Sequence, residues 1–151
     1  MSQSKYDVLK LENQLCFPLY AAAREVVKRY RPHLDALDLT YTQYITMMVL
    51  WEKREINVKS LGELLFLDSG TLTPVLKSLE AKGYVTRMRS QSDERSVTVA
   101  LTDTGVALRE SAAEIPQRIA GCVGLEAAEA VQLYSLLYKI LARTKPSDVD
   151  Q

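Results

Sequence analysis

Residues 58–102 read VKSLGELLFLDSGTLTPVLKSLEAKGYVTRMRSQSDERSVTVALT. Apolar residues in the first part of this stretch recur at three- and four-residue spacing, whereas after Gly83 they alternate with polar ones. This change of spacing predicts two helices joined by a tight turn, followed by two short strands over 85–89 and 97–101 that enclose a polar loop. The order of elements is that of a winged helix-turn-helix, so we predict a mainly α-helical fold with a small β-wing.

The second predicted helix has one apolar stripe and one side of small polar residues. The stripe is expected to hold Leu72, Val75, Leu76 and Leu79. The other side carries short hydroxylic residues and one lysine, which suit a helix that enters the major groove of DNA. The residues of this helix that we predict to contact DNA are Ser69, Gly70, Thr71, Thr73, Pro74 and Lys77.

The loop between the two strands is the candidate wing. Arg87, Arg89 and Arg95 are spaced to contact phosphates, and an arginine at the loop tip could enter the minor groove. Asp93 is expected to orient Arg95 through an ion pair, and Ser96 completes the predicted contact set. The alternative is an exposed hairpin with solvated charges, but its position after a helix-turn-helix favours DNA.

The composition limits the protein to a few classes. A chain of 151 residues with 47% hydrophobic residues and no net charge is suited to a single domain with a core. The absence of a long apolar run and of a signal-like N-terminus predicts a soluble, cytoplasmic protein without a membrane segment. Two distant cysteines, a single histidine and no glycine-rich phosphate loop predict neither a metal site nor a cofactor.

The two ends of the chain are predicted to form long helices with excess apolar surface. The first is expected over 7–31 and the last over 125–143, and both carry more apolar residues than one packing surface needs. We therefore predict a homodimer. The predicted organisation is one domain over 1–151, with dimerisation helices over 7–40 and 103–143, a DNA-binding core over 41–102 and a frayed tail over 144–151.

Prolines and capping residues predict where several helices bend, begin and end. Pro18 is expected to kink the first helix, Pro32 to end it, and Pro116 to break the helix that follows the wing. The residues predicted to cap helix N-termini are Thr40, Asn57, Asp68 and Thr102.

The two cysteines allow both a structural and a chemical interpretation. A lone cysteine such as Cys16 is most often a small hydrophobic residue. Tyr20, Tyr30 and Tyr41 could however donate hydrogen bonds to its thiolate, unless these tyrosines only line an interface. Cys122 lies in a turn flanked by glycines, where it is either free to approach another thiol or inert.

Two segments carry a family resemblance. LDSGTLTPVLKSLEAKGYVTR (67–87), followed by DERSVTVALTDTG (93–105), resembles the winged-helix core of the MarR family of bacterial repressors. The wing pattern of that family is matched by Asp93, Arg95, Leu101 and Thr102. LENQLCFPLYAAAREVVKRYRPHLDALDLTYTQY (11–44) resembles more narrowly the organic hydroperoxide resistance regulators, so the resemblance spans nearly the whole chain.

The resemblance implies a mechanism and roles for individual residues. It implies that the reduced dimer represses a gene by binding a pseudo-palindromic operator in double-stranded DNA, and that an organic hydroperoxide is the effector. Cys16 would be the peroxide sensor, with Tyr20 beside it and Tyr30 and Tyr41 reaching it from the opposite subunit. The two-cysteine members of the subgroup imply that Cys122 of the partner chain then forms a disulfide with Cys16, whereas members without a second cysteine use a small cellular thiol.

Two other functions remain open on the sequence. One is a MarR-type repressor that is released by a small phenolic ligand without covalent chemistry. The other is a thiol peroxidase, which is disfavoured because no histidine, arginine or threonine constellation around either cysteine supplies a general acid. We therefore predict that the protein is not an enzyme and has no catalytic residues.

Overall fold

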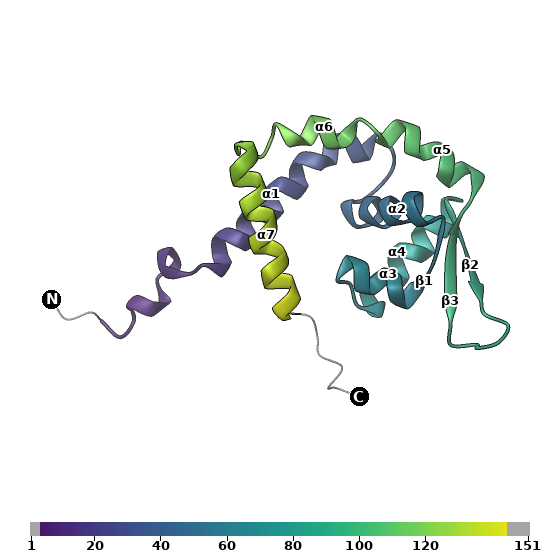
Figure 1. Cartoon of the computed structure of the whole chain (residues 1–151), viewed down its shortest axis with the longest axis horizontal. Coiled ribbons are helices and arrows are strands. Elements are labelled where there is room, and N and C mark those ends of the chain that lie inside the picture. The colour runs from purple at the N-terminus through teal and green to yellow at the C-terminus, as the bar shows by residue number, and fades with distance from the viewer. Residues whose placement is uncertain (1–3, 145–151) are drawn as a thin grey trace.

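The segment over residues 58–102 folds into the elements predicted for it. The computed structural model describes residues 4–144. Within them, α3 (Val58–Leu65) and α4 (Ser69–Ala81) are followed by the antiparallel strands β2 (Val85–Arg89) and β3 (Val97–Leu101) (Figure 1). Gly83 has a φ of +79° between α4 and β2, a conformation that favours glycine. The predicted class, mainly helical with a small β-wing, is confirmed.

A third strand, absent from the sequence prediction, completes the sheet. After α2 (Tyr41–Lys53), residues Glu55–Asn57 form β1, which pairs antiparallel with β3. The strand order is β1-β3-β2, and Val99 of the central strand faces Ile56 on one side and Arg87 on the other. A strand of three residues is too short to show the alternation by which strands are recognised in a sequence.

The helix caps agree with the prediction. Thr40 forms a complete capping box with Gln43 at the start of α2, since each side chain bonds to the backbone N–H of the other residue. Asn57, Asp68 and Thr102 accept hydrogen bonds from the first turns of α3, α4 and α5 (Asp103–Ala112), respectively.

The N-terminal region differs from the prediction. The single helix expected over 7–31 is replaced by two 3₁₀ turns, Asp7–Leu9 and Leu11–Asn13, and by α1 (Cys16–Asp35). The kink predicted at Pro18 is wrong because this residue lies in the first turn of α1, where no carbonyl needs its missing N–H. The helix end predicted at Pro32 is also wrong, since α1 continues past it to Asp35.

The core lies between α2, α3, α4 and the sheet. Three leucines of the predicted stripe on α4, Leu72, Leu76 and Leu79, are at most 1% exposed, while Val75 is half-buried. They pack with side chains from the neighbouring elements that are fully buried, namely Met47, Leu50, Leu61, Val85 and Val99. Burial of α4 along this stripe fixes which of its sides faces solvent.

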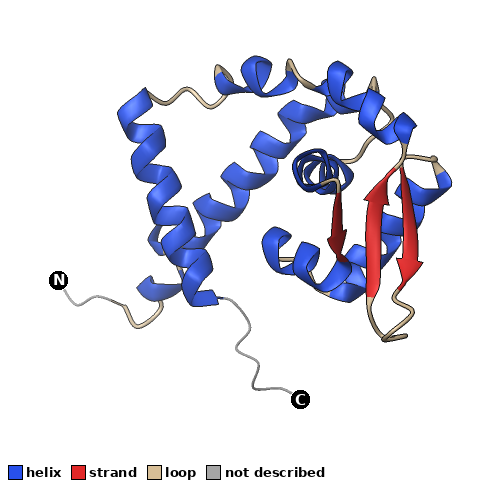
Figure 2. Ribbon diagram, turned by 45° about the vertical axis from the view of Figure 1, so that its right-hand side comes forward, coloured by secondary structure: helices blue, strands red, loops and turns tan. Residues whose placement is uncertain are grey.

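The helices after the wing lead away from the sheet. The break expected at Pro116 separates α5 from α6 (Ile115–Ala120), in which this proline occupies the first turn. Figure 1 and Figure 2 show α5 and α6 as an arm that connects the sheet with α7 (Ala127–Thr144) on the far side of the molecule. The predicted tail beyond Thr144 lies outside the described residues.

Both long terminal helices expose apolar side chains. No side chain of α7 is buried, and Val131 and Tyr134 are 67% and 63% exposed. Leu15, directly before α1, is 81% exposed, and Tyr20 on α1 is 62% exposed. None of the helices that the structure describes is long and apolar enough to cross a membrane.

Candidate DNA-reading surface and cysteine site

The residues predicted to read DNA share one side of α4. Ser69, Gly70, Thr71, Pro74 and Lys77 are exposed, and Thr73 is half-buried. At the start of this helix, the carboxylate of Asp68 accepts hydrogen bonds from the Thr71 N–H (2.8 Å) and hydroxyl (3.1 Å). These bonds hold the pKa of Asp68 below its ordinary value. The hydroxyl of Thr71 therefore donates its hydrogen bond to Asp68 of the same chain.

The wing arginines differ in their surroundings. Arg89 and Arg95 are exposed, whereas Arg87 is half-buried. The Nη2 of Arg87 lies 2.7 Å from Oε2 of Glu80 on α4, and its Nε lies 3.1 Å from the same oxygen. The hydrogen bond from Arg87 lowers the pKa of Glu80. This ion pair thus connects β2, the strand that leads into the wing, to the last turn of α4.

The base of the wing is held by polar contacts, but not by the ion pair expected between Asp93 and Arg95. The carboxylate of Asp93 instead accepts a hydrogen bond from the backbone N–H of Arg95 (3.0 Å), and no ion pair joins the two side chains in the described part of the chain. That prediction is wrong because a short aspartate next to a turn bonds most easily to the backbone two residues on. Ser96 accepts a hydrogen bond from Asn57, which links the wing to the start of α3.

Cys16 and Cys122 are both free and exposed. Cys16 opens α1, and Tyr20 follows one turn later with the guanidinium of Arg24 5.3 Å from its ring centre. Cys122 follows α6 in a turn, where its N–H donates to the carbonyl of Ile119 (2.8 Å).

The other two predicted pocket residues belong to an aromatic cluster. The rings of Tyr30 and Tyr41 meet edge to face with centres 4.9 Å apart, and Tyr44 lies 5.8 Å from Tyr30. Burial raises the pKa of all three phenols, so they are neutral hydrogen-bond donors at physiological pH. Tyr44, which is 3% exposed, was missing from the prediction although its position one turn after Tyr41 placed it on the same side of α2.

One chain does not bring Cys16 and this cluster together. Fourteen positions of the same helix separate Cys16 from Tyr30, which corresponds to a rise of about 21 Å at 1.5 Å per residue. A groove of about 630 Å³ extends along α1 from Tyr20 to Tyr41, with apolar walls that include Val27 and Leu39. Tyr20 is therefore the only predicted pocket residue within one helical turn of Cys16.

No metal centre is apparent in residues 4–144, which contain no group of three or more histidine, cysteine or acidic side chains that could hold an ion.

Comparison with known proteins shows where the chain belongs. The family model described as "Transcriptional regulator SarA/Rot" matches residues 28–111. The organic hydroperoxide resistance transcriptional regulator of Bacillus subtilis is 50% identical over 139 residues, which cover 92% of this chain and 95% of that protein.

Solved structures of regulators also resemble this chain over most of its length. The reduced AbfR protein bound to DNA is 36% identical, with a TM-score of 0.75 over 93% of this chain and 98% of that one. The disulfide form of AbfR, at 35% identity, gives a TM-score of 0.63 over 91% and 96%. A cysteine-to-serine mutant of MarR from E. coli, complexed with operator DNA, is 25% identical, with a TM-score of 0.78 over 92% and 99%.

The regulator of Bacillus subtilis matches almost the whole length of this chain, and the solved regulators share its fold over more than nine-tenths of that length. None of these relatives is described as an enzyme. This chain is a transcriptional regulator of the MarR family and belongs to the group of the organic hydroperoxide resistance regulators.

Proposed function

We propose that the protein is a homodimeric repressor that is released from its operator when an organic hydroperoxide oxidises Cys16. The observation that carries this proposal is the distance between Cys16 and the neutral tyrosine cluster along one helix. In an antiparallel pair of α1 helices, the N-terminal end of one would lie beside Tyr30 and Tyr41 of the other. Assembly would then complete a sensor site whose two halves stand apart within each subunit.

The exposed apolar surface supports assembly through the terminal helices. Leucine, valine and tyrosine side chains on α7 lack burial within their own chain, and α1 exposes a similar set. Patches of this kind are unfavourable in water and mark interaction surfaces. A two-fold dimer would present two copies of α4 to successive major grooves, which explains why the operator would be pseudo-palindromic.

The proposed chemistry starts at the Cys16 thiolate. Its sulfur attacks the terminal peroxide oxygen, the O–O bond breaks, and the peroxide leaves as an alcohol after it takes up a proton. The sulfur is oxidised to a sulfenic acid by two electrons, and the peroxide is reduced by the same two. The Cys122 thiol of the partner subunit then attacks this sulfur, which forms the S–S bond and releases water.

Disulfide formation would demand movement that could release DNA. The Cα atoms of two bonded cysteines must lie within about 7 Å of each other. Cys16 begins α1, and Cys122 lies just after the arm formed by α5 and α6. Formation of the disulfide would therefore shift α1 and this arm, both of which connect to the segment that holds α4 and the wing. This chain overlays equally well on the reduced and on the overoxidised DNA-bound forms of AbfR, with TM-scores of 0.75 and 0.74, and less well on the disulfide form, which supports a change of shape that accompanies disulfide formation.

The decisive experiment combines a non-reducing gel with a DNA-shift assay before and after cumene hydroperoxide. Wild type is expected to form a linked dimer and release DNA. Cys16→Ser should do neither, and Cys122→Ser should lose the linked dimer and show weaker release. Release of Cys16→Ser by a small phenol would favour a non-covalent effector, and wild-type binding that is insensitive to peroxide would refute the sensor role.

A further inference from the structure

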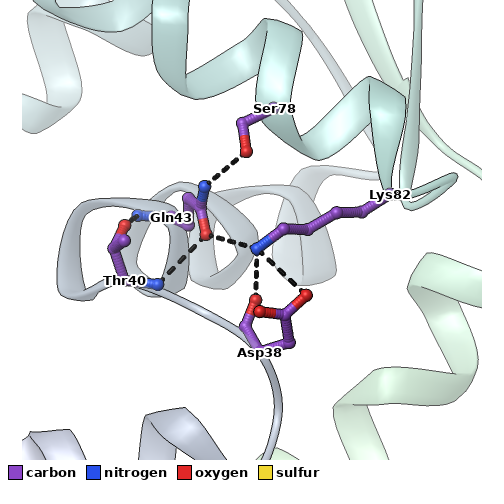
Figure 3. A network of polar contacts seen from close by, with 5 residues as sticks. All are labelled: Asp38, Thr40, Gln43, Ser78 and Lys82. Atoms are coloured by element: carbon purple, nitrogen blue, oxygen red, sulfur yellow. Dashed lines mark hydrogen bonds and ion pairs between the residues drawn. The ribbon is translucent and has the colours of Figure 1, made fainter.

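A polar network connects the α1–α2 turn with the C-terminal end of α4 (Figure 3). Its centre is Gln43, which is 6% exposed. The amide nitrogen of Gln43 donates to the hydroxyl of Ser78 on α4 at 2.9 Å. Its amide oxygen accepts from the N–H of Thr40 at 3.0 Å and from the Nζ of Lys82 at 3.2 Å. A single side chain thus contacts the N-cap of α2 and two residues at the end of α4.

Lys82 extends the network to the turn itself. Its Nζ donates to the backbone carbonyl of Asp38 and lies 3.4 Å from the carboxylate of the same residue. Asp38 has a φ of +52°, a left-handed backbone conformation that aspartate tolerates better than most residues. Lys82, the C-cap of α4, makes two contacts with this turn from more than forty positions later in the chain.

The network lies between the tyrosine cluster and the DNA-reading helix. Tyr41 is the first residue of α2 and directly follows the N-cap Thr40, while Tyr44 directly follows Gln43. Buried amides are costly to leave without partners, so displacement of either helix end alone would be opposed. A shift of the turn or of Tyr41 must therefore carry the end of α4 with it.

We propose that Gln43 and Lys82 are positioning residues that transmit a change at the tyrosine cluster to the recognition helix α4. This inference rests on the proposed peroxide response. It assigns the transmission to contacts within one subunit, through the α1–α2 turn. A displacement of the C-terminal end of α4 would then change how its exposed side is presented to DNA.

The test measures the operator Kd of reduced and of peroxide-oxidised protein by fluorescence anisotropy, with the extent of oxidation checked on each sample. The quantity of interest is the ratio of the oxidised to the reduced Kd. Lys82→Met and Ser78→Ala are expected to lower this ratio by at least about fivefold at equal oxidation, since allosteric couplings commonly span five- to 150-fold. A residue that only stabilises the fold would weaken both states alike and leave the ratio unchanged.

Matched variants keep the result interpretable. Lys53→Met changes an exposed lysine at the end of α2, which pairs with the neighbouring Glu52, and should keep the wild-type ratio. Gln43→Glu preserves the acceptor for Thr40 and Lys82, and the Ser78 hydroxyl can turn to donate to it, so this variant should also keep the ratio.

Two results distinguish a failure of the proposed peroxide response from a failure of the transmission role. A wild-type ratio of one would refute the proposed peroxide response itself. A wild-type ratio well above one that persists in both Lys82→Met and Ser78→Ala would refute the transmission role alone. Neither variant removes a fully buried side chain, so both are expected to fold, and a thermal melt of each confirms this.

Discussion

The guanidinium of Arg87 and the carboxylate of Glu80 lie 2.7 Å apart, which joins the first strand of the wing to the last turn of the recognition helix. This contact joins the two elements that we predict to enter neighbouring regions of DNA. The ion pair also engages Arg87, which we predict from the sequence to contact a DNA phosphate.

Glu80→Gln tests this competition. The substitution removes a negative charge next to the reading surface and frees Arg87, so operator binding at low salt should tighten. The slope of log K against log salt should steepen by about one unit if the guanidinium then takes up a phosphate contact. Anisotropy titrations at several salt concentrations measure both quantities.

The control for this variant is Glu114→Gln, which removes an ion pair of the same 2.7 Å length with Arg118 far from α4. Its salt slope should equal that of wild type. An unchanged slope for Glu80→Gln would show that Arg87 stays away from DNA even when it is released.

Alkaline pH should destabilise the protein through the tyrosine cluster. Burial raises the folded-state pKa of Tyr30, Tyr41 and Tyr44. Their contribution is complete below the ordinary tyrosine value of about 10 and is lost as the pH rises through the raised values, because the unfolded chain ionises first. Thermal melts across this range should show a steep fall in Tm above that pH.

Tyr41→Phe is expected to make this alkaline fall shallower. Tyr6→Phe, at a site that is 62% exposed, should leave it unchanged. Equal pH profiles for wild type and Tyr41→Phe would contradict the assignment to the buried cluster.

Gly105→Ala should be strongly destabilising. A Cβ at this position would lie 2.1 Å from the carbonyl oxygen of Tyr84, which is backbone and yields little. The shift would also disturb the hydrogen bond from the Trp51 indole to the Gly105 carbonyl. Overpacking of this kind costs about 2–3 kcal/mol. Urea unfolding followed by tryptophan fluorescence gives the value, and Gly121→Ala, where a Cβ meets nothing within 4 Å, is the control.

Arg54→Gly should stabilise the protein. Arg54, the C-cap that follows α2, has φ +69° and ψ −45°, a strained conformation for any residue with a Cβ. Relief of that strain, less the entropy that glycine adds to the unfolded chain, should raise the free energy of unfolding by about 1 kcal/mol. Lys53→Gly, one residue earlier and inside the helix, should lower it by about the same amount. A loss of stability for Arg54→Gly would show that its side chain contributes more than its backbone costs.

The features predicted correctly from the sequence depend on neighbours along the chain. Thr40, Asn57 and Asp68 cap their helices because each side chain reaches only two or three residues ahead. The apolar stripe of α4 follows from helical spacing in the same way. The fold class could be predicted because the decisive stretch of sequence is continuous.

The errors depend on contacts between distant residues or on the exact register of a helix. Pro18 was misjudged because a helix that begins at Cys16 places this residue in the first turn, where no carbonyl needs a donor. Pro32 was misjudged because it lies in the last turn of α1, which continues for three more residues although the Lys28 carbonyl loses its donor. The pair of Arg87 with Glu80 and the contact of Gln43 with Ser78 are made by packing of separate elements, and hydrophobic periodicity does not encode either one.

The open surface of α7 has a consequence for gene control. A helix that buries no side chain within its own chain gains its stability from association, so in the proposed homodimer its order depends on protein concentration by mass action. Dilution would then dissociate the dimer into monomers that each carry one copy of α4 and one wing. The number of protein copies in a cell would set a threshold below which the operator is unoccupied, whatever the oxidation state of Cys16.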